Sequence, residues 1–223
     1  MPDIQIPNVV IVLLQIFLAF AAAFLIALLL FAAGGALAWL AAGTAGLLLT
    51  AVYVGLNLVY SLGGKDVALL DVFLLSAGFV LRVLFGCALI GAPPSNWLLL
   101  CSSALALFLA LIKRRADVAR GVDPSHRPSL DGYTLGFLDH AITITAAMTL
   151  IGYALYCIEA QVLVPGREFA TLPFVIFGVL DYLRRAHLHQ EGGDPVRIIF
   201  ASPVLIACGV GWIAAMLWSV QLP

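Results

Sequence analysis

The chain has 223 residues, of which 63% are hydrophobic and only 10% are charged, and its mean hydropathy is +1.11. Soluble domains carry roughly 25% charged residues, so this composition excludes a water-soluble globular fold and predicts that lipid surrounds much of the chain. The formal net charge of −1 gives no sign of nucleic-acid binding. The four cysteines stand singly, without the CxxC spacing of metal sites, and we interpret them as small packing residues.

Seven apolar stretches are long enough to cross a membrane, because a bilayer core of about 30 Å requires roughly 20 apolar residues in a helix. Gly34-Gly35 ends the first stretch, residues 92–95 end the third, and Pro165-Gly166 follows the fifth. The predicted fold class is therefore all-α: a polytopic transmembrane bundle of about seven helices, with residues 1–223 as a single transmembrane domain. The predicted spans are 9–33, 36–60, 67–91, 96–112, 133–158, 169–188 and 198–220.

The basic residues gather on one side of the membrane if the N-terminus lies inside. Nine of the eleven lysines and arginines then fall in predicted inner loops, and the outer loops hold only Arg167. Cytoplasmic loops carry such an excess of positive charge. The sequence thus predicts a multi-pass protein of the plasma (inner) membrane, with its N-terminus and its active face in the cytoplasm. The longest polar segment, about 113–132, lies on that face.

Asp71 and Arg82 are charged residues that the sequence places within one membrane helix. Eleven positions separate them, which is about three turns or roughly 16 Å, so they share a helix face without forming a direct ion pair. Charged side chains inside a membrane are costly and commonly functional. Arg82 is therefore a candidate functional residue. A structural arginine that caps carbonyl groups of a neighbouring helix is an equally good interpretation.

A second group of charges follows the fourth apolar stretch. Lys113, Asp117 and Arg120 stand at i, i+4 and i+7, which places them on one stripe if the helix continues beyond the membrane. Lysine and arginine suit phosphate binding, and aspartate can hold a divalent cation. A topology signal that anchors the helix to lipid headgroups is the alternative, and composition alone favours it.

Three stretches carry a family resemblance: YSLGGK at residues 60–65 followed by Asp71, GFVLRVLFG at 78–86, and LFLALIKRRAD at 107–117. The last leads through Arg127 and Ser129 to Tyr133. In these motifs the chain resembles the UbiA-type polyprenyl transferase superfamily, and within it the decaprenyl-phosphate phosphoribosyltransferase branch. The similarity runs from about residue 9 to residue 185 and is densest over 57–156.

The resemblance implies a bundle of about nine helices that opens to lipid and transfers 5-phosphoribose from phosphoribosyl pyrophosphate to a polyprenyl phosphate, a step of cell-wall biosynthesis. It implies Mg²⁺ as the cofactor. The implied partners are the polyprenyl phosphate lipid, the phosphorylated sugar diphosphate donor and the bilayer. By position, it assigns catalytic roles to Lys65, Arg82, Lys113, Arg114 and Asp117, with Asp117 as a metal ligand. It assigns substrate binding to Tyr60, Asp71, Arg115, Arg127 and Tyr133.

The chain also departs from the superfamily, because its main metal-binding element, NDxxDxxxD, does not occur in the 223 residues. We therefore expect the chain to begin at the family's third helix, without the principal carboxylates, and to transfer phosphoribose slowly at most when alone. Three explanations stay open: a fragment, a degenerate relative without catalysis, or a chain that works with a partner chain or as a homo-oligomer. The alternative functions are a prenyl-diphosphate-dependent prenyltransferase and a non-catalytic polyprenyl-phosphate-binding or transport protein.

Overall fold

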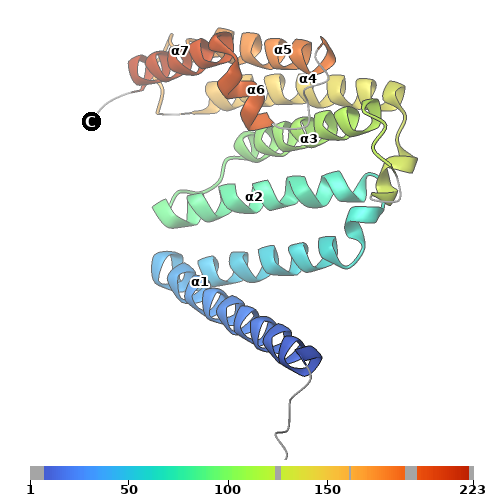
Figure 1. Ribbon diagram of the computed structural model, residues 1–223. Helices are drawn as coiled ribbons and strands as arrows, with labels where there is room; N and C mark the ends of the chain where they lie inside the picture. The colour runs from blue at the N-terminus through green and yellow to red at the C-terminus, as the bar shows by residue number, and fades with distance from the viewer. Residues whose placement is uncertain (1–7, 124–126, 161, 189–194, 221–223) are drawn as a thin grey trace, which may run out of the picture. The chain divides into compact units, whose positions relative to one another are not determined.

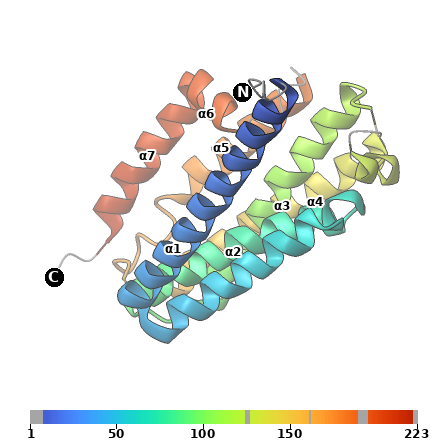
Figure 2. The ribbon, with the colours of Figure 1, turned by 60° about the horizontal axis from the view of Figure 1, so that its bottom comes forward.

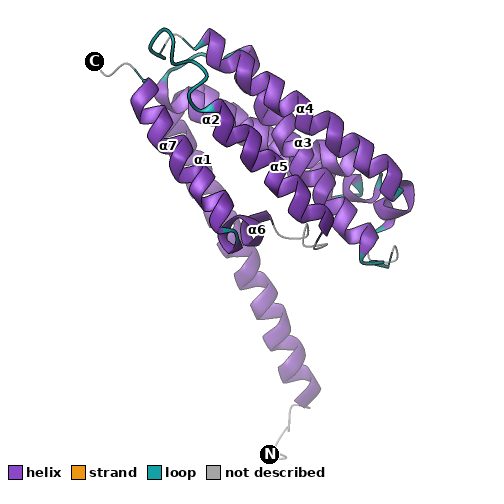
Figure 3. Cartoon of the chain, turned by 90° about the horizontal axis from the view of Figure 1, so that it is seen from above, coloured by secondary structure: helices purple, strands orange, loops and turns teal. Residues whose placement is uncertain are grey.

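The computed structural model describes residues 8–123, 127–160, 162–188 and 195–220. In these ranges the chain forms seven α-helices, two short 3-10 helices and one isolated β-bridge between Leu163 and Val220. The ribbon in Figure 3 is almost entirely helical, with short loops between the helices. The predicted all-α fold class is confirmed.

The chain divides into two compact units, residues 1–51 and residues 52–223. The described part of the first unit is one apolar segment of helix α1 (Asn8–Ser61), and the backbone leaves helical geometry at Ala42 and at Gly43, where φ is +59°. A Cβ on Gly46 would collide with the carbonyl oxygen of Ala38, so small residues permit this bend. The predicted break at Gly34-Gly35 is wrong, because the helix continues through both glycines and bends eight residues later.

The second unit begins in the last turns of α1 and contains the remaining elements. Helix α3 packs against both α2 and α4, and α5 packs against α7 (Figures 1 and 2). The bounds of these elements are η1 Gly64–Asp66, α2 Leu70–Ile90, α3 Asn96–Ala119, η2 Pro128–Gly132, α4 Leu135–Glu159, α5 Leu172–Leu188, α6 Pro195–Ala201 and α7 Pro203–Ser219.

Four of the described helices are long and apolar enough to cross a membrane: α1 over Gln15–Ser61, α2, α3 and α4. The apolar part of α1 has 47 residues, more than twice the roughly 20 that one crossing requires, and the bend at Ala42–Gly43 divides it. Helix α7 is a shorter apolar helix of 17 residues. The chain is therefore a multi-pass membrane protein.

The predicted last span, 198–220, is divided into α6 and α7. Ser202 is fully buried, and its side chain accepts a hydrogen bond from the backbone N–H of Leu205 at 3.2 Å, which caps α7. Pro203 follows at the first helical position, where its missing N–H costs nothing. Helix α3, in turn, continues to Ala119, seven residues beyond the predicted span end at residue 112. This extension brings the charged KRRAD segment onto a helix rather than into a loop.

The buried core of the second unit lies where α2, α3 and α4 meet. Val72, Phe108, Ile112, Leu138 and Ile142 are each at most 1% exposed. Farther along, α3 and α4 approach so closely at Gly152 that an added Cβ would lie 3.3 Å from backbone atoms of residue 101, a tight contact. The core residues border the charged ends of α2 and α3, so the fold holds those ends in a fixed geometry.

Candidate anion-binding site

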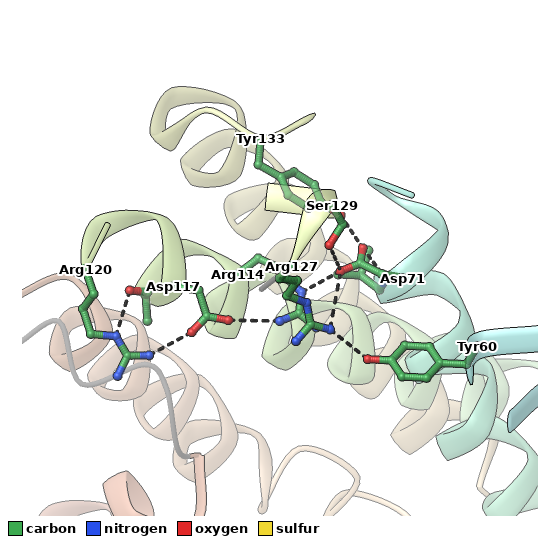
Figure 4. A network of polar contacts seen from close by, with 10 residues as sticks. Tyr60, Asp71, Arg114, Asp117, Arg120, Arg127, Ser129 and Tyr133 are labelled. Atoms are coloured by element: carbon green, nitrogen blue, oxygen red, sulfur yellow. Dashed lines mark hydrogen bonds and ion pairs between the residues drawn. The ribbon is translucent and has the colours of Figure 1, made fainter. Parts of the chain in front are cut away.

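Polar side chains converge where the end of α1, the start of α2, the end of α3 and the helix η2 meet (Figure 4). The hydrogen bonds and ion pairs there form one continuous network across these four segments. Its members are Tyr60, Asp71, Arg114, Asp117, Arg120, Arg127, Ser129 and Tyr133.

Asp71, in the first turn of α2, is the centre of the network and is completely buried. Its Oδ2 accepts from Arg114 Nε at 2.7 Å and from Ser129 Oγ at 3.2 Å, while its Oδ1 accepts from Tyr133 Oη at 2.7 Å. The backbone N–H of Val72 also donates to Oδ1 at 2.8 Å. A buried charge is tolerated only when it is paired and hydrogen-bonded, and Asp71 meets both conditions.

Arg114 is the largest fully buried side chain in the described residues, with 1% of it exposed. Its Nε binds Asp71, and its Nη1 donates to Asp117 Oδ2 at 3.0 Å. The other oxygen of Asp117 accepts from Arg120 Nη2 at 2.9 Å. Arg114 is therefore fixed between two carboxylates, and its charge cannot move away from this end of the bundle.

Arg127 completes the network and retains unused hydrogen-bonding capacity. Its Nη2 donates to Tyr60 Oη at 2.8 Å and lies 4.0 Å from Asp71 Oδ2. Its Nε is buried and has no hydrogen-bond partner among the described residues. Arg114, Arg120 and Arg127 contribute three positive charges against the two negative charges of Asp71 and Asp117. The network therefore carries a net charge of +1 and can attract an anion.

Tyr133 holds the entry into α2. Its hydroxyl donates to Asp71 and accepts the backbone N–H of Leu69 at 2.7 Å. Leu69 has φ +67°, a left-handed conformation that is strained for a side chain of this kind and persists only when its surroundings enforce it. Burial raises the pKa of Tyr133, and the hydrogen bond to Asp71 raises the pKa further. Tyr133 thus remains a neutral donor, although the resemblance assigned it to substrate.

Four of the residues assigned by resemblance lie outside this network, namely Lys65, Arg82, Lys113 and Arg115. Arg115 forms an ion pair with Asp139 on α4, and Asp139 also lies 3.1 Å from His187 Nε2 on α5. Lys65 and Lys113 are exposed, and no hydrogen bond or ion pair within the described ranges involves either. Both lysines are free to contact a ligand, while Arg115 serves a contact between helices.

Arg82 also lies apart from the network, and its surroundings are aromatic. Its Nη2 donates to Tyr53 Oη at 2.7 Å, and its guanidinium carbon lies 5.4 Å from the Tyr53 ring centroid and 4.9 Å from that of Phe79. Tyr53 was not among the residues predicted from the motifs. The seven-residue interval between Tyr53 and Tyr60 places both on one face of α1, and that spacing was the available signal.

A large apolar cavity of about 420 Å³ lies between α3, α4, α5 and α7. Its walls include Phe108, Tyr153, Phe174, Leu205 and Trp212. Cavities that hold small molecules measure roughly 300–1,000 Å³ and are mainly apolar. The second unit therefore combines a cationic network at one end with an apolar cavity between its helices.

The residues of this site do not offer magnesium a complete set of ligands. Within the described ranges, no group of three or more His, Cys, Asp or Glu side chains is placed to hold a metal ion. Both oxygens of Asp117 already accept hydrogen bonds from guanidinium groups. The role of Asp117 as a metal ligand stays a prediction, and the chemistry of the site is that of cations that bind an anion.

Fold and site together define a multi-pass helical membrane protein with a cationic network at one end of its bundle. No family model matches the chain. It is 28% identical over 177 residues to the decaprenyl-phosphate phosphoribosyltransferase of Corynebacterium glutamicum, covering 77% of this chain and 53% of that protein. The Mycobacterium tuberculosis protein of the same name is 28% identical over 176 residues, a match that covers 76% of this chain and 56% of that protein. The protein of the same name from Mycolicibacterium smegmatis is 34% identical over 120 residues, a match that covers 53% of this chain and 37% of that protein.

These similarities confirm the resemblance to the decaprenyl-phosphate phosphoribosyltransferases that the motifs predicted. The chain spans about half the length of the curated relatives it matches.

Proposed function

We propose that this chain is a membrane transferase that moves 5-phosphoribose from phosphoribosyl pyrophosphate to a polyprenyl phosphate, for lipid-linked sugar synthesis in the cell envelope. The names of its relatives support the transfer reaction. The arrangement around Arg127 carries the proposal. A cationic side chain with a buried, unpartnered Nε stands beside a fully paired buried aspartate, in a network whose net charge is +1.

The proposed transfer forms a bond between a phosphate oxygen of the lipid and the anomeric carbon of the sugar. The bond from that carbon to the pyrophosphate oxygen breaks, and pyrophosphate leaves with the electron pair. Guanidinium groups stabilise the charge that develops on the leaving group, most effectively when they are fixed before the reaction. Arg114, held by Asp71 and Asp117, supplies such a fixed charge, and Arg127 supplies the donor that is still unused.

We further propose that the network faces the cytoplasm at the plasma membrane, because nine of the eleven basic residues lie on that side in the predicted topology. The large apolar cavity is suited to part of the lipid chain. Magnesium stays an expectation from the resemblance.

A second candidate is a protein that binds polyprenyl phosphate without catalysis, and the shortage of metal ligands in the described residues favours it. One experiment separates the two. The purified chain is reconstituted into vesicles with undecaprenyl phosphate, Mg²⁺ and phosphoribosyl pyrophosphate labelled in its ribose, and label is measured in the extracted lipid.

Label above that of empty vesicles, lost in Arg127→Gln and retained in Arg167→Gln, would support the transferase. Arg167 is a suitable control because it is an arginine outside the network, bonded to the carbonyl oxygen of Trp218. Retention of undecaprenyl phosphate without label in the lipid would support the non-catalytic binder. Neither label nor lipid retention would contradict both functions.

A further inference from the structure

Arg82 is a cation inside a membrane helix for which the described residues supply no carboxylate. It is residue 13 of the 21 in α2, one of the helices long and apolar enough to cross the membrane. Among the described side chains, its polar partner is the hydroxyl of Tyr53. An arginine inside a membrane is costly unless an anion or water compensates its charge. Its position therefore requires an explanation that the Asp71 network does not supply.

The side chain of Arg82 is exposed, and its guanidinium contacts two aromatic neighbours. The Tyr53 hydroxyl accepts one of its hydrogen bonds, and the rings of Tyr53 and Phe79 flank it at 5.4 and 4.9 Å. Cation–π contacts of this kind stabilise a charge without neutralising it. The side chain thus keeps a full positive charge beside the two rings.

A pocket of about 140 Å³ lies against this guanidinium, between the last turns of α1 and residues 74–82 of α2. Arg82, Tyr53, Asn57 and Tyr60 are its polar walls, and three leucines, Gly78 and Phe79 line the rest. The volume is below the roughly 300–1,000 Å³ of pockets that enclose a whole small molecule. It suits one compact anionic group attached to an apolar chain, rather than a sugar diphosphate.

The pocket is connected to the Asp71 network through Tyr60. That side chain lines the pocket, and its hydroxyl accepts a hydrogen bond from Arg127. Phe79, against which the guanidinium of Arg82 lies, is eight positions from Asp71, or about 12 Å along the helix axis. Two cationic sites therefore lie at different depths of the bundle and share one tyrosine between them.

We propose that the Arg82 pocket binds the phosphate monoester headgroup of the membrane-embedded acceptor lipid, while the donor's phosphates bind at Arg114 and Arg127. This assignment rests on the proposed transferase function. It gives each substrate its own cation: the donor meets the network at the polar end, and the lipid phosphate meets an arginine within the bilayer. Tyr60 stands between the two phosphates.

The test measures binding of the two substrates separately, with the full chain in detergent or nanodiscs. The lipid probe is radiolabelled undecaprenyl phosphate, undecaprenol is the probe without phosphate, and phosphoribosyl pyrophosphate is the donor probe. Arg82→Gln should weaken undecaprenyl phosphate binding by about tenfold to hundredfold, as expected for a lost charged hydrogen bond. Its affinity for undecaprenol and for phosphoribosyl pyrophosphate should stay within about twofold. Arg127→Gln should show the opposite pattern.

Two further variants keep the test independent of folding defects. Tyr53→Phe retains both the ring and the arginine, removes one neutral hydrogen-bond partner, and should weaken undecaprenyl phosphate binding by about twofold to tenfold. Arg167→Gln is the matched control, because Arg167 also donates one hydrogen bond, to the carbonyl oxygen of Trp218, and its guanidinium carbon lies 4.2 Å from the centroid of the Trp218 ring. It should leave both substrates unaffected.

Undecaprenyl phosphate binding that Arg82→Gln leaves unchanged would overturn this inference, while donor binding by the wild-type chain would still support the proposed function. Competition by inorganic phosphate as strong as that by the lipid would identify a soluble anion as the occupant, and would overturn the lipid assignment. A wild-type chain that binds neither substrate would contradict the proposed function itself.

Discussion

Replacement of Asp71 by asparagine should be among the most destabilising single changes in this chain. The carboxylate is completely buried, and it pairs at 2.7 Å with Arg114, which is itself 1% exposed. Asparagine removes the charge and places an amide among donors, so the guanidinium keeps only Asp117 as its counter-charge. Breaking one member of a buried pair costs about 3–5 kcal/mol. We expect a loss of this size in the free energy of unfolding.

Unfolding by SDS in mixed micelles, followed by circular dichroism, measures this change. Asp131→Asn is the matched control, because Asp131 is an exposed aspartate on η2, and its replacement should change the free energy by no more than about 0.5 kcal/mol. The double variant Asp71→Leu/Arg114→Met should recover most of the stability, since an apolar pair of similar volume can replace a buried ion pair. An Asp71→Asn variant as stable as Asp131→Asn would show that the buried Asp71–Arg114 pair does not stabilise the fold.

The remaining predictions concern the packing around the network. Tyr133→Phe should cost about 1–3 kcal/mol, because it leaves a buried acceptor and a backbone donor without their partner. The pKa of Tyr133 is raised above the usual value of about 10. Its contribution to the free energy of unfolding is therefore present below about pH 10 and is lost as the pH rises through the folded-state pKa. Wild-type protein should show one tyrosinate absorbance step, absent from the variant, at higher pH than free tyrosine. Gly132→Ala should destabilise the chain and weaken donor binding, since its Cβ would collide with Ala68, whereas Gly136→Ala meets open space and should be neutral or stabilising. Gly152→Val should force α3 and α4 apart and lower the SDS concentration at the unfolding midpoint, and an unchanged midpoint would show that the close approach is dispensable.

The sequence predicted the membrane fold because hydropathy and length act locally. The positions of the helix boundaries were less predictable. The bend of α1 at Ala42–Gly43 depends on the approach of Gly46 to Ala38, which no composition rule distinguishes from the Gly34-Gly35 pair. The division between α6 and α7 had a signal in the Ser202–Pro203 cap, which an unbroken apolar stretch concealed.

The sequence motifs named several residues of the candidate site, but they did not predict which of these residues contact one another. Asp71 and Arg114 were both named from motifs, but their ion pair joins residues 43 positions apart and depends on how α2 packs against α3. Arg82 was expected to share a helix face with Asp71, but its contacts with the rings of Tyr53 and Phe79 were not predicted. The Arg115–Asp139–His187 contact joins three helices and has no local sequence signal.

Binding of phosphoribosyl pyrophosphate to the purified chain, measured by isothermal titration calorimetry in nanodiscs, tests the central claim most directly. We expect saturable binding that weakens at least tenfold in Arg127→Gln, because Arg127 supplies the unused buried donor. Arg167→Gln should bind like the wild-type chain. Absence of saturable binding, or equal binding by Arg127→Gln and the wild type, would show that the Arg127 network is not the donor site.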